Sequence, residues 1–273
     1  MEEIIIRPKP KWQLVDLKEI WRYRELLYIF TWRDIKVKYK QTFLGILWVI
    51  FQPLFTTIIF TVFFGNLAKI PSGELPYSLF VLCGLVFWTF FSSAVSHASD
   101  SMITNESIIK KVYFPKDILP ISAVITNSID LFINIIFLFI YAFILGFTPN
   151  LLGLFIMPLA IILTFLTASG LGLFLSSINV KYRDIRYILP FFIQILLFVT
   201  PIIYPLSIVS EKKRIIMAIN PMTSVVELVR FIFSPNYIIR PELISISVIS
   251  SMAIMFVSLW YFRRTEKFFA DIV

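Results

Sequence analysis

The sequence has one cysteine and one histidine, Cys83 and His97, among 273 residues. A single cysteine excludes an intrachain disulfide, and together with one histidine it is too little for a zinc centre of the usual kind. The eight glycines form no G-x-x-x-x-G-K-[ST] loop, so the phosphate cradle of an ATPase is missing. With no H-E-x-x-H segment and no credible Ser/His/Asp set, we expect no catalytic residue, no metal ligand and no cofactor bound by this chain.

Charged residues are also scarce, at 15% of the chain, whereas hydrophobic residues make up 58% and the mean hydropathy is +0.85. Soluble domains contain roughly 45–50% apolar residues. Six stretches approach or exceed the roughly 20 apolar residues that a helix needs to cross a bilayer. They cover residues 44–64, 78–98, 118–146, 151–177, 187–205 and 242–262. The sequence therefore predicts an all-α, polytopic membrane protein with six transmembrane helices.

The 25 Lys and Arg residues outnumber the 17 Asp and Glu residues, which gives a net charge of +8. Most of the basic residues precede the first span, follow the sixth, or lie in the second-to-third and fourth-to-fifth loops. The positive-inside rule then places both termini in the cytoplasm. This charge is an orientation signal, and we expect no nucleic-acid partner.

Residues 1–40 are predicted to be a cytoplasmic segment that ends in an amphipathic interface helix from residue 14 onward. Its apolar side carries Trp and Tyr and its other side is basic, a pattern typical of helices that lie among lipid headgroups. The alternative is a soluble helix packed on another domain, but the first span follows at once, which favours the interface. The candidate contacts with lipid phosphates are Arg33, Lys36, Lys38, Tyr39 and Lys40.

The second-to-third loop contains a segment, Asn105–Tyr113, that suits a short capped helix ending before Phe114-Pro115. Such a helix would be a docking point for a soluble partner, although a solvated connector fits the pattern equally well. The candidate docking residues are Asn105, Glu106, Ser107, Ile108, Ile109, Lys110 and Lys111.

The region 206–241 faces outside by the charge count, yet it contains two apolar stretches that are too short to span a bilayer. Segments of this kind are often re-entrant or interfacial, so we predict short re-entrant helices at the outer face. Glu227 and Arg230 are spaced to pair on one helix face. The candidate gate residues are Met217, Val226, Glu227 and Arg230.

Asp130 is the one acidic residue deep within a predicted span. An intramembrane carboxylate is costly, so it either pins helix packing through an interhelical hydrogen bond or lines a channel. Aromatic residues are dense near the span boundaries, where most serve as membrane belts, and some would stack on sugars along a path. The candidate channel-lining residues are Trp48, Phe87, Trp88, Phe91, Asp130 and Tyr204.

A series of short motifs, in this order and spacing, closely resembles the ABC-2 type permeases that export O-antigen and other lipid-linked polysaccharides. The likeness extends from about residue 30 to 265. The motifs are Arg33–Thr42, Leu44-Gly45, Trp48, Gln52-Pro53-Leu54, Phe64-Gly65, Pro76-Tyr77, Gly84–Trp88, Asn105-Glu106-Ser107, Lys111–Pro115, Lys181–Asp184, Pro201–Tyr204 and Asn220-Pro221.

The resemblance implies a transmembrane domain over residues 41–265, between the segment 1–40 and a cytoplasmic tail, 266–273. It implies a homodimer around a continuous channel in the bacterial inner membrane, with membrane lipids around it and two separate ABC ATPase subunits that use ATP and Mg. The helix matching 105–113 would couple to the ATPase, the segment 207–235 would form the exit gate, and the cargo would be an undecaprenyl-linked polysaccharide.

Two other functions compete with polysaccharide export. An ABC-2 permease for another cargo, such as teichoic acid, a lipid or a drug, stays open because the motifs report architecture more than cargo. A self-sufficient secondary transporter or a membrane transferase would show in-span coupling charges, inverted repeats or an acid/base set, and the sequence shows none of them.

Overall fold

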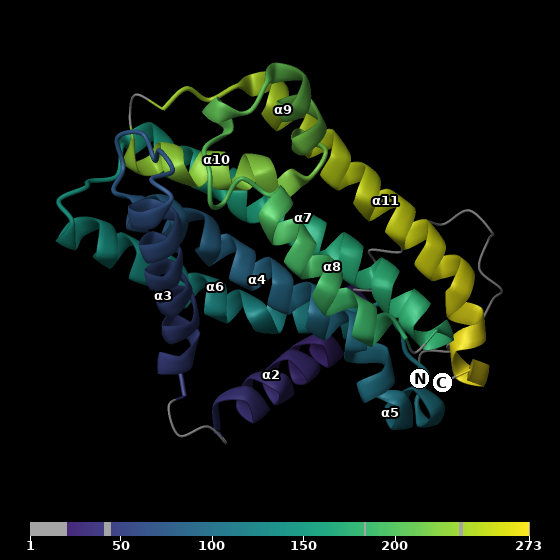
Figure 1. Cartoon of the computed structure of the whole chain (residues 1–273). Coiled ribbons are helices and arrows are strands. Elements are labelled where there is room, and N and C mark those ends of the chain that lie inside the picture. Colours follow the sequence, from purple (N-terminus) through teal and green to yellow (C-terminus); the bar gives the residue numbers. More distant parts are fainter. Residues whose placement is uncertain (1–20, 41–44, 183, 235–236, 273) are drawn as a thin grey trace.

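The computed structural model describes residues 21–40, 45–182, 184–234 and 237–272, and every regular element among these residues is a helix (Figure 1). The first part of the predicted interface segment, up to residue 20, lies outside the described residues. The helices are α2 (Arg24–Lys40), α3 (Leu47–Phe60), the π-helix η1 (Thr61–Leu67), α4 (Tyr77–Thr104), α5 (Glu106–Lys111), α6 (Ile118–Ile144), α7 (Leu151–Lys181), α8 (Ile185–Val199), the 3-10 turn η2 (Leu206–Ile208), α9 (Glu211–Ala218), α10 (Pro221–Phe233) and α11 (Pro241–Ile272).

Five helical segments in the described part of the chain are long and apolar enough to cross a membrane: α3 with η1, α4, α6, α7 and α11. The predicted all-α, polytopic architecture is therefore confirmed. The predicted fifth span, 187–205, is shorter in the structure, because α8 ends at Val199 after 15 residues, about 22 Å of helix. The following Thr200 is extended and precedes Pro201, which disfavours helix at the residue before it.

The central helix is α4, and most of its residues from Leu79 to Ala98 are fully buried. It packs on α6, α7 and α10, while α7 also packs on α11. At the crossing of α4 and α7, a Cβ added to Gly172 would lie 2.6 Å from the Cβ of Ala98. The absence of a side chain at Gly172 therefore allows the two helices to approach closely, as small residues do in membrane bundles.

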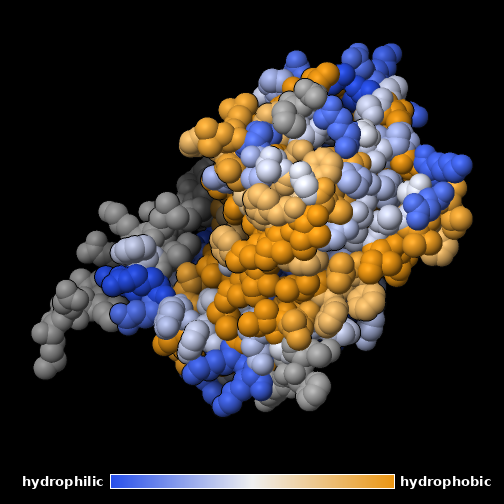
Figure 2. Space-filling view, turned by 90° about the vertical axis from the view of Figure 1, so that its left-hand side faces the viewer, coloured by the Kyte–Doolittle hydropathy of each residue, from blue (hydrophilic) through white to orange (hydrophobic). Residues whose placement is uncertain are grey.

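The two ends of the bundle differ in composition from its middle. Figure 1 shows α9 and α10 at one end, and α2 and α5 at the other, beside the C-terminal part of α11. In Figure 2, apolar side chains gather over the middle of the face shown, with hydrophilic side chains at opposite ends. A bilayer would cover such an apolar middle, which leaves the short helices at its two surfaces.

The first span is the least embedded of the five. Its most apolar window is 11% buried within the subunit, against 78% for α4. Figure 1 shows α3 standing at the edge of the bundle. The face of α3 that the subunit leaves uncovered is therefore available to lipid or to another chain.

Candidate functional site

The C-terminal end of α2 is bonded to the third span through charged and polar side chains. The Nζ atom of Lys38 lies 2.5 Å from an oxygen of Asp130 in α6 and donates to Asn127 Oδ1 at 3.1 Å. The hydroxyl of Tyr39 donates to the other Asp130 oxygen. Asn127 also meets His97 of α4 through a hydrogen bond of 3.1 Å. The Asp130 carboxylate, which lies within the third apolar span, thus has a cationic partner that comes from α2.

This ion pair is partly withdrawn from water, with the Lys38 and Asp130 side chains 28% and 16% exposed. Burial and the neighbouring Asp130 carboxylate raise the pKa of Tyr39 above its ordinary value, so its hydroxyl stays protonated and keeps donating. The interhelical hydrogen bond that the sequence suggests for Asp130 is present, between α6 and α2. Its effect is to hold α2 against α6.

The predicted lipid-contact residues therefore divide into two groups. Lys36 and Lys40 are exposed, and Lys36 lies over the ring of Trp32, 5.2 Å from its centre. Arg33 pairs with its neighbour Asp34 at 2.8 Å. The sequence predicts that Lys38 and Tyr39 contact headgroup phosphates. In the structure their side chains point to α6 and bond Asp130 instead. The sequence could not reveal this, because the partner residues are about 90 positions away.

The short helix α5 lies in the loop between α4 and α6, where the sequence predicts a docking helix. It is six residues long, and the side chain of Asn105 donates to Ser101 O at 2.8 Å instead of capping the helix. Lys110 pairs with Glu106 one turn earlier at 2.6 Å. Ile109 is buried, whereas Ser107, Lys110 and Lys111 are exposed, as are Val112 and Tyr113 just beyond the helix. The helix thus has one anchoring side chain and one open face.

The buried side of α5 belongs to an apolar cluster, here called the α5 cluster, that joins six helices. Its buried members are Phe30, Met102, Ile109, Phe114, Ile118, Leu119, Leu173, Val180, Leu259, Phe262 and Phe269. Beside it, Arg263 of α11 pairs with the fully buried Asp117 at 2.9 Å. A displacement of α5 would therefore shift the side chains that α2, α4, α6, α7 and α11 contribute to this cluster, because close-packed interiors transmit strain.

Three of the aromatic channel candidates are in the wrong place for that role. Phe87, Trp88 and Phe91 are at most 5% exposed and lie in the core around α4. Their rings face neighbouring helices of the same subunit, so in this conformation they offer no surface to a sugar. Trp48, 63% exposed on α3, and the half-buried Tyr204 just after α8 are the aromatic candidates that stay at a surface.

At the opposite end, α9 and α10 form a pair bent by 106°. The whole side chain of Arg230 in α10 is buried, and its guanidinium lies 3.4 Å from the centre of the Phe80 ring. It donates to Ile202 O at 2.8 Å and to Phe80 O at 3.3 Å, and it pairs with Glu227 at 3.3 Å. The predicted Glu227–Arg230 pair is confirmed, and Arg230 anchors α10 to the start of α4.

The predicted gate residues also divide by burial. Val226, like Arg230, is fully buried, so it belongs to the anchor of α10 rather than to a moving surface. Met217 of α9 is half-buried. Around it, Ile215, Ile216 and Ile219 are 52%, 66% and 58% exposed. Within the predicted gate, the exposed apolar surface is presented by α9, by Ile219 just after it and by Ile208 before it, and not by α10.

Comparison with known proteins agrees with this architecture. Residues 25–234 match the family described as ABC-2 type transporter. The O-antigen export system permease protein RfbA of Klebsiella pneumoniae is 30% identical over 250 residues, which is 91% of this chain and 95% of the relative. Its namesake from Myxococcus xanthus is 28% identical over 92% of this chain and 97% of the relative. The polysialic acid transport protein KpsM of Escherichia coli is 22% identical over 86% of this chain and 91% of the relative.

The membrane-helix fold and the match to the family model together define the class of protein. The chain is a multi-pass membrane protein, and it belongs to the ABC-2 type transporter family. The resemblance carried by the sequence motifs is thereby confirmed.

The contact between α2 and α6 predicts coupling between two distant residues. Lys38→Met and Asp130→Asn should each lower the melting temperature of the purified protein, because each strands a partly buried charged group whose hydrogen bond is worth about 1.5–3 kcal/mol. The double variant should lose less than the sum of the two. Lys36→Met, on the exposed side of the same helix, is the control. Strictly additive losses would show that the pair is not coupled.

The anchor of α10 predicts a larger loss. Arg230→Met removes the cationic partner of Glu227 and the donor to two carbonyl groups, and breaking a buried pair costs about 3–5 kcal/mol. Arg230→Lys should not restore the melting temperature, because an ammonium group lacks the planar fork of arginine. Arg240→Met, which breaks an exposed pair with Glu211, should cost about 0–1 kcal/mol. Equal melting temperatures for Arg230→Met and Arg240→Met would contradict the assignment.

Proposed function

We propose that this chain is the permease subunit of an ATP-driven exporter that moves an undecaprenyl-linked polysaccharide across the bacterial inner membrane. The observation that carries the proposal is the near full-length similarity to relatives whose names state O-antigen export or polysialic acid transport. Membrane helices without an ATPase loop support a permease over a self-contained pump. An ABC-2 permease for another cargo, such as teichoic acid, a lipid or a drug, is the second candidate.

Energy would enter from two ABC ATPase subunits that bind ATP and Mg and dock at α5. The open face of α5 supports this docking, because exposed Lys110 and Lys111 stand beside exposed Val112 and Tyr113. Aromatic residues such as Tyr113 are enriched at the cores of protein interfaces, and charged residues such as the two lysines occupy their polar rims. Closure of the ATPase pair would displace α5, and the α5 cluster would pass the displacement to α2 and the spans.

A second copy of this chain would complete the transport path. The uncovered side of α3 and the exposed aromatic residues of α8, among them Tyr187, Phe191 and Phe192, give each subunit a large apolar surface. Two such subunits facing each other would enclose a channel between them. Trp48 and Tyr204 lie at the surface where they would line it.

The carrier lipid would meet the channel at the interface helix. Lys36 and Lys40 are exposed, and Lys36 lies beside Trp32, a residue type that prefers the headgroup region. At the other side of the membrane, α9 would act as the gate over the rigid α10. Burying Ile215, Ile216 and Ile219 against the second copy would close the pore to ions while no cargo passes.

The docking role of α5 predicts uncoupling by charge. Lys110→Glu with Lys111→Glu should reduce copurification of the ATPase and separate ATP hydrolysis from export, because the docking charge is reversed. The control exchanges two charges, Glu106→Lys with Lys110→Glu, which retains the pair within the helix and leaves Lys111 in place. It should lose less. Normal export and normal copurification of the double-glutamate variant would contradict the docking role.

The division of the basic residues on α2 predicts which of them the carrier lipid contacts. Lys36→Gln with Lys40→Gln should weaken the stimulation of ATPase activity by carrier phosphate in the reconstituted complex, by about 1 kcal/mol of binding per charge. Arg24→Gln, exposed in the first turn of the same helix, is the matched control. Unchanged stimulation in the Lys36/Lys40 variant would leave these charges as topology signals.

A further inference from the structure

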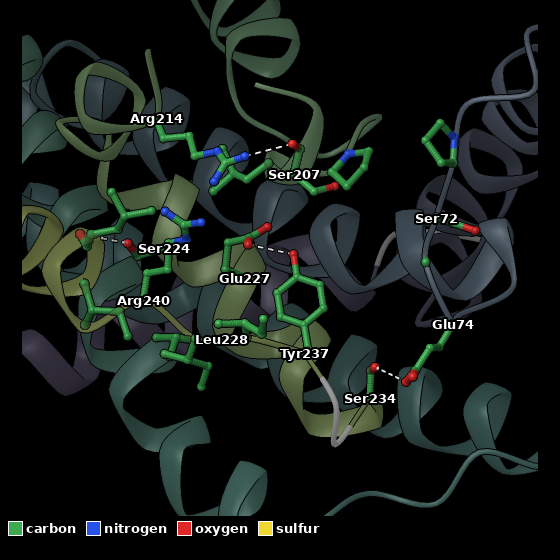
Figure 3. A pocket seen from close by; sticks show the side chains of 18 residues that line it. Ser72, Glu74, Ser207, Arg214, Ser224, Glu227, Leu228, Ser234, Tyr237 and Arg240 are labelled. Carbon is green, nitrogen blue, oxygen red and sulfur yellow. Dashed lines mark hydrogen bonds between the residues drawn. The ribbon is translucent and has the colours of Figure 1, made fainter. Parts of the chain in front are cut away.

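A cavity of about 430 Å³ lies at the outer end of the bundle, beside the α9–α10 pair (Figure 3). Its wall is built by the loop 71–74 before α4, the segment 205–207, α9, α10, the segment 237–240 and the start of α11. Its size is within the roughly 300–1,000 Å³ of small-molecule sites. Of the predicted site residues, Glu227 alone lines it, and the wall shares Ser207, Arg214, Ser224, Leu228 and Ser234 with the predicted gate segment 207–235.

The cavity is lined by equal numbers of acidic and basic side chains. Two carboxylates, Glu74 and Glu227, and two guanidinium groups, Arg214 and Arg240, line it, together with the hydroxyl groups of serines and of Tyr237. Equal numbers of acidic and basic groups do not select a strongly charged ligand. They suit a neutral molecule whose groups both donate and accept hydrogen bonds.

Several of these polar groups are held in position by the protein itself. Arg214 donates to Val209 O at 2.6 Å and to Ser207 O at 2.7 Å, which fixes the plane of its guanidinium. The Tyr237 hydroxyl donates to Glu227 at 2.6 Å, and Figure 3 shows this bond in the middle of the wall. Ser234 donates to Glu74 at 2.8 Å on the other side. Polar groups fixed in this way bind a ligand without a further ordering cost.

The rest of the wall is apolar and includes Pro71, Pro205, Leu228 and Ile239. A sugar ring matches such a wall, because its hydroxyl groups lie around its edge and its C–H groups form apolar faces. Carboxylate and guanidinium groups hold pairs of neighbouring hydroxyls, while proline and aliphatic side chains cover the faces.

We propose that this cavity binds a neutral sugar residue of the glycan on the outer side of the membrane. The inference rests on the proposed function and adds to it a place where the emerging chain is held beside α9. A sugar held there would oppose backsliding of the glycan between strokes of the ATPase.

The test uses a single reactive thiol in the detergent-purified complex of the permease with its ATPase. Ile238→Cys, in a Cys83→Ala background, places the thiol on the cavity wall at a position that is 80% exposed. The probe is glycan released by mild acid from the surface polysaccharide of the host. At about twice its Kd, the probe should slow maleimide labelling of this thiol about threefold. Lys212→Cys, exposed on α9 and outside the wall, is the control and should label at an unchanged rate.

A second pair of variants tests whether the cavity itself is needed. Ser72→Trp in the Ile238→Cys background fills the space and should abolish protection by the glycan, whereas Lys212→Trp should retain it. Unprotected labelling of Ile238→Cys, or equal slowing at both cysteines, overturns the inference. Protection by glycerophosphoethanolamine instead of the glycan also overturns it, because the cavity would then hold a lipid headgroup.

Transport measured after the same purified complex is reconstituted into proteoliposomes separates this inference from the proposed function. ATP-driven glycan transport without protection of Ile238→Cys contradicts the sugar site and leaves the proposed function in place. A wild-type complex that transports no glycan contradicts the proposed function, and the sugar site falls with it.

Discussion

The ion pair between Lys38 and Asp130 holds α2 against the third span, α6, and the packing of α2 on the bundle depends on it. A carboxylate within a membrane is costly unless it is paired, so the bundle needs a cation at that depth. The cation comes from α2, which must therefore stay beside α6. Through Asn127 and His97 the same polar group reaches α4, the central helix. The helix that would meet the carrier lipid is thus bonded to the helices that form the core.

At the end of the bundle that carries α9 and α10, a buried charge is stabilised in a different way. Arg230 is fully buried, and its charge is met by Glu227, by two carbonyl oxygens and by the face of Phe80. This anchor makes α10 part of the core and leaves α9 as the exposed arm of the pair. The bundle is therefore fastened at both ends, while α3 and α8 are only loosely attached to it. Loosely attached helices beside a rigid core would suit the interface of the proposed dimer, in which two subunits move relative to each other.

The sequence was informative where a signal is local. Long apolar stretches located the five long membrane helices, and the spacing of Glu227 and Arg230 predicted their pair, because both depend on residues near each other in the chain. The short α5 was also found, although the expected cap at Asn105 is absent, since that side chain bonds backward to Ser101. The end of α8 at Thr200-Pro201 was missed because apolar composition continued beyond it.

Contacts between distant segments were beyond the reach of such patterns. No local spacing connects Lys38 with Asp130, and no composition distinguishes the buried rings of Phe87, Trp88 and Phe91 from rings that face a channel. The cavity beside α9 and α10 is a similar case, since its polar groups come from several segments between Pro71 and Ile244. These features follow from tertiary packing. The periodicity of hydrophobic residues predicts only whether a side chain is buried or exposed, and does not predict which residues it contacts.

Transport in proteoliposomes tests the central claim most directly. The permease and its ATPase partner are reconstituted together, a fluorescent lipid-linked glycan is supplied on the ATPase side, and its appearance on the opposite side is measured. The account predicts that glycan crosses only when permease, ATPase and hydrolysable ATP are all present, and that a lipid without glycan does not replace it. Crossing driven by an ion gradient through the permease alone, or an equal preference for a glycan-free lipid, would contradict it.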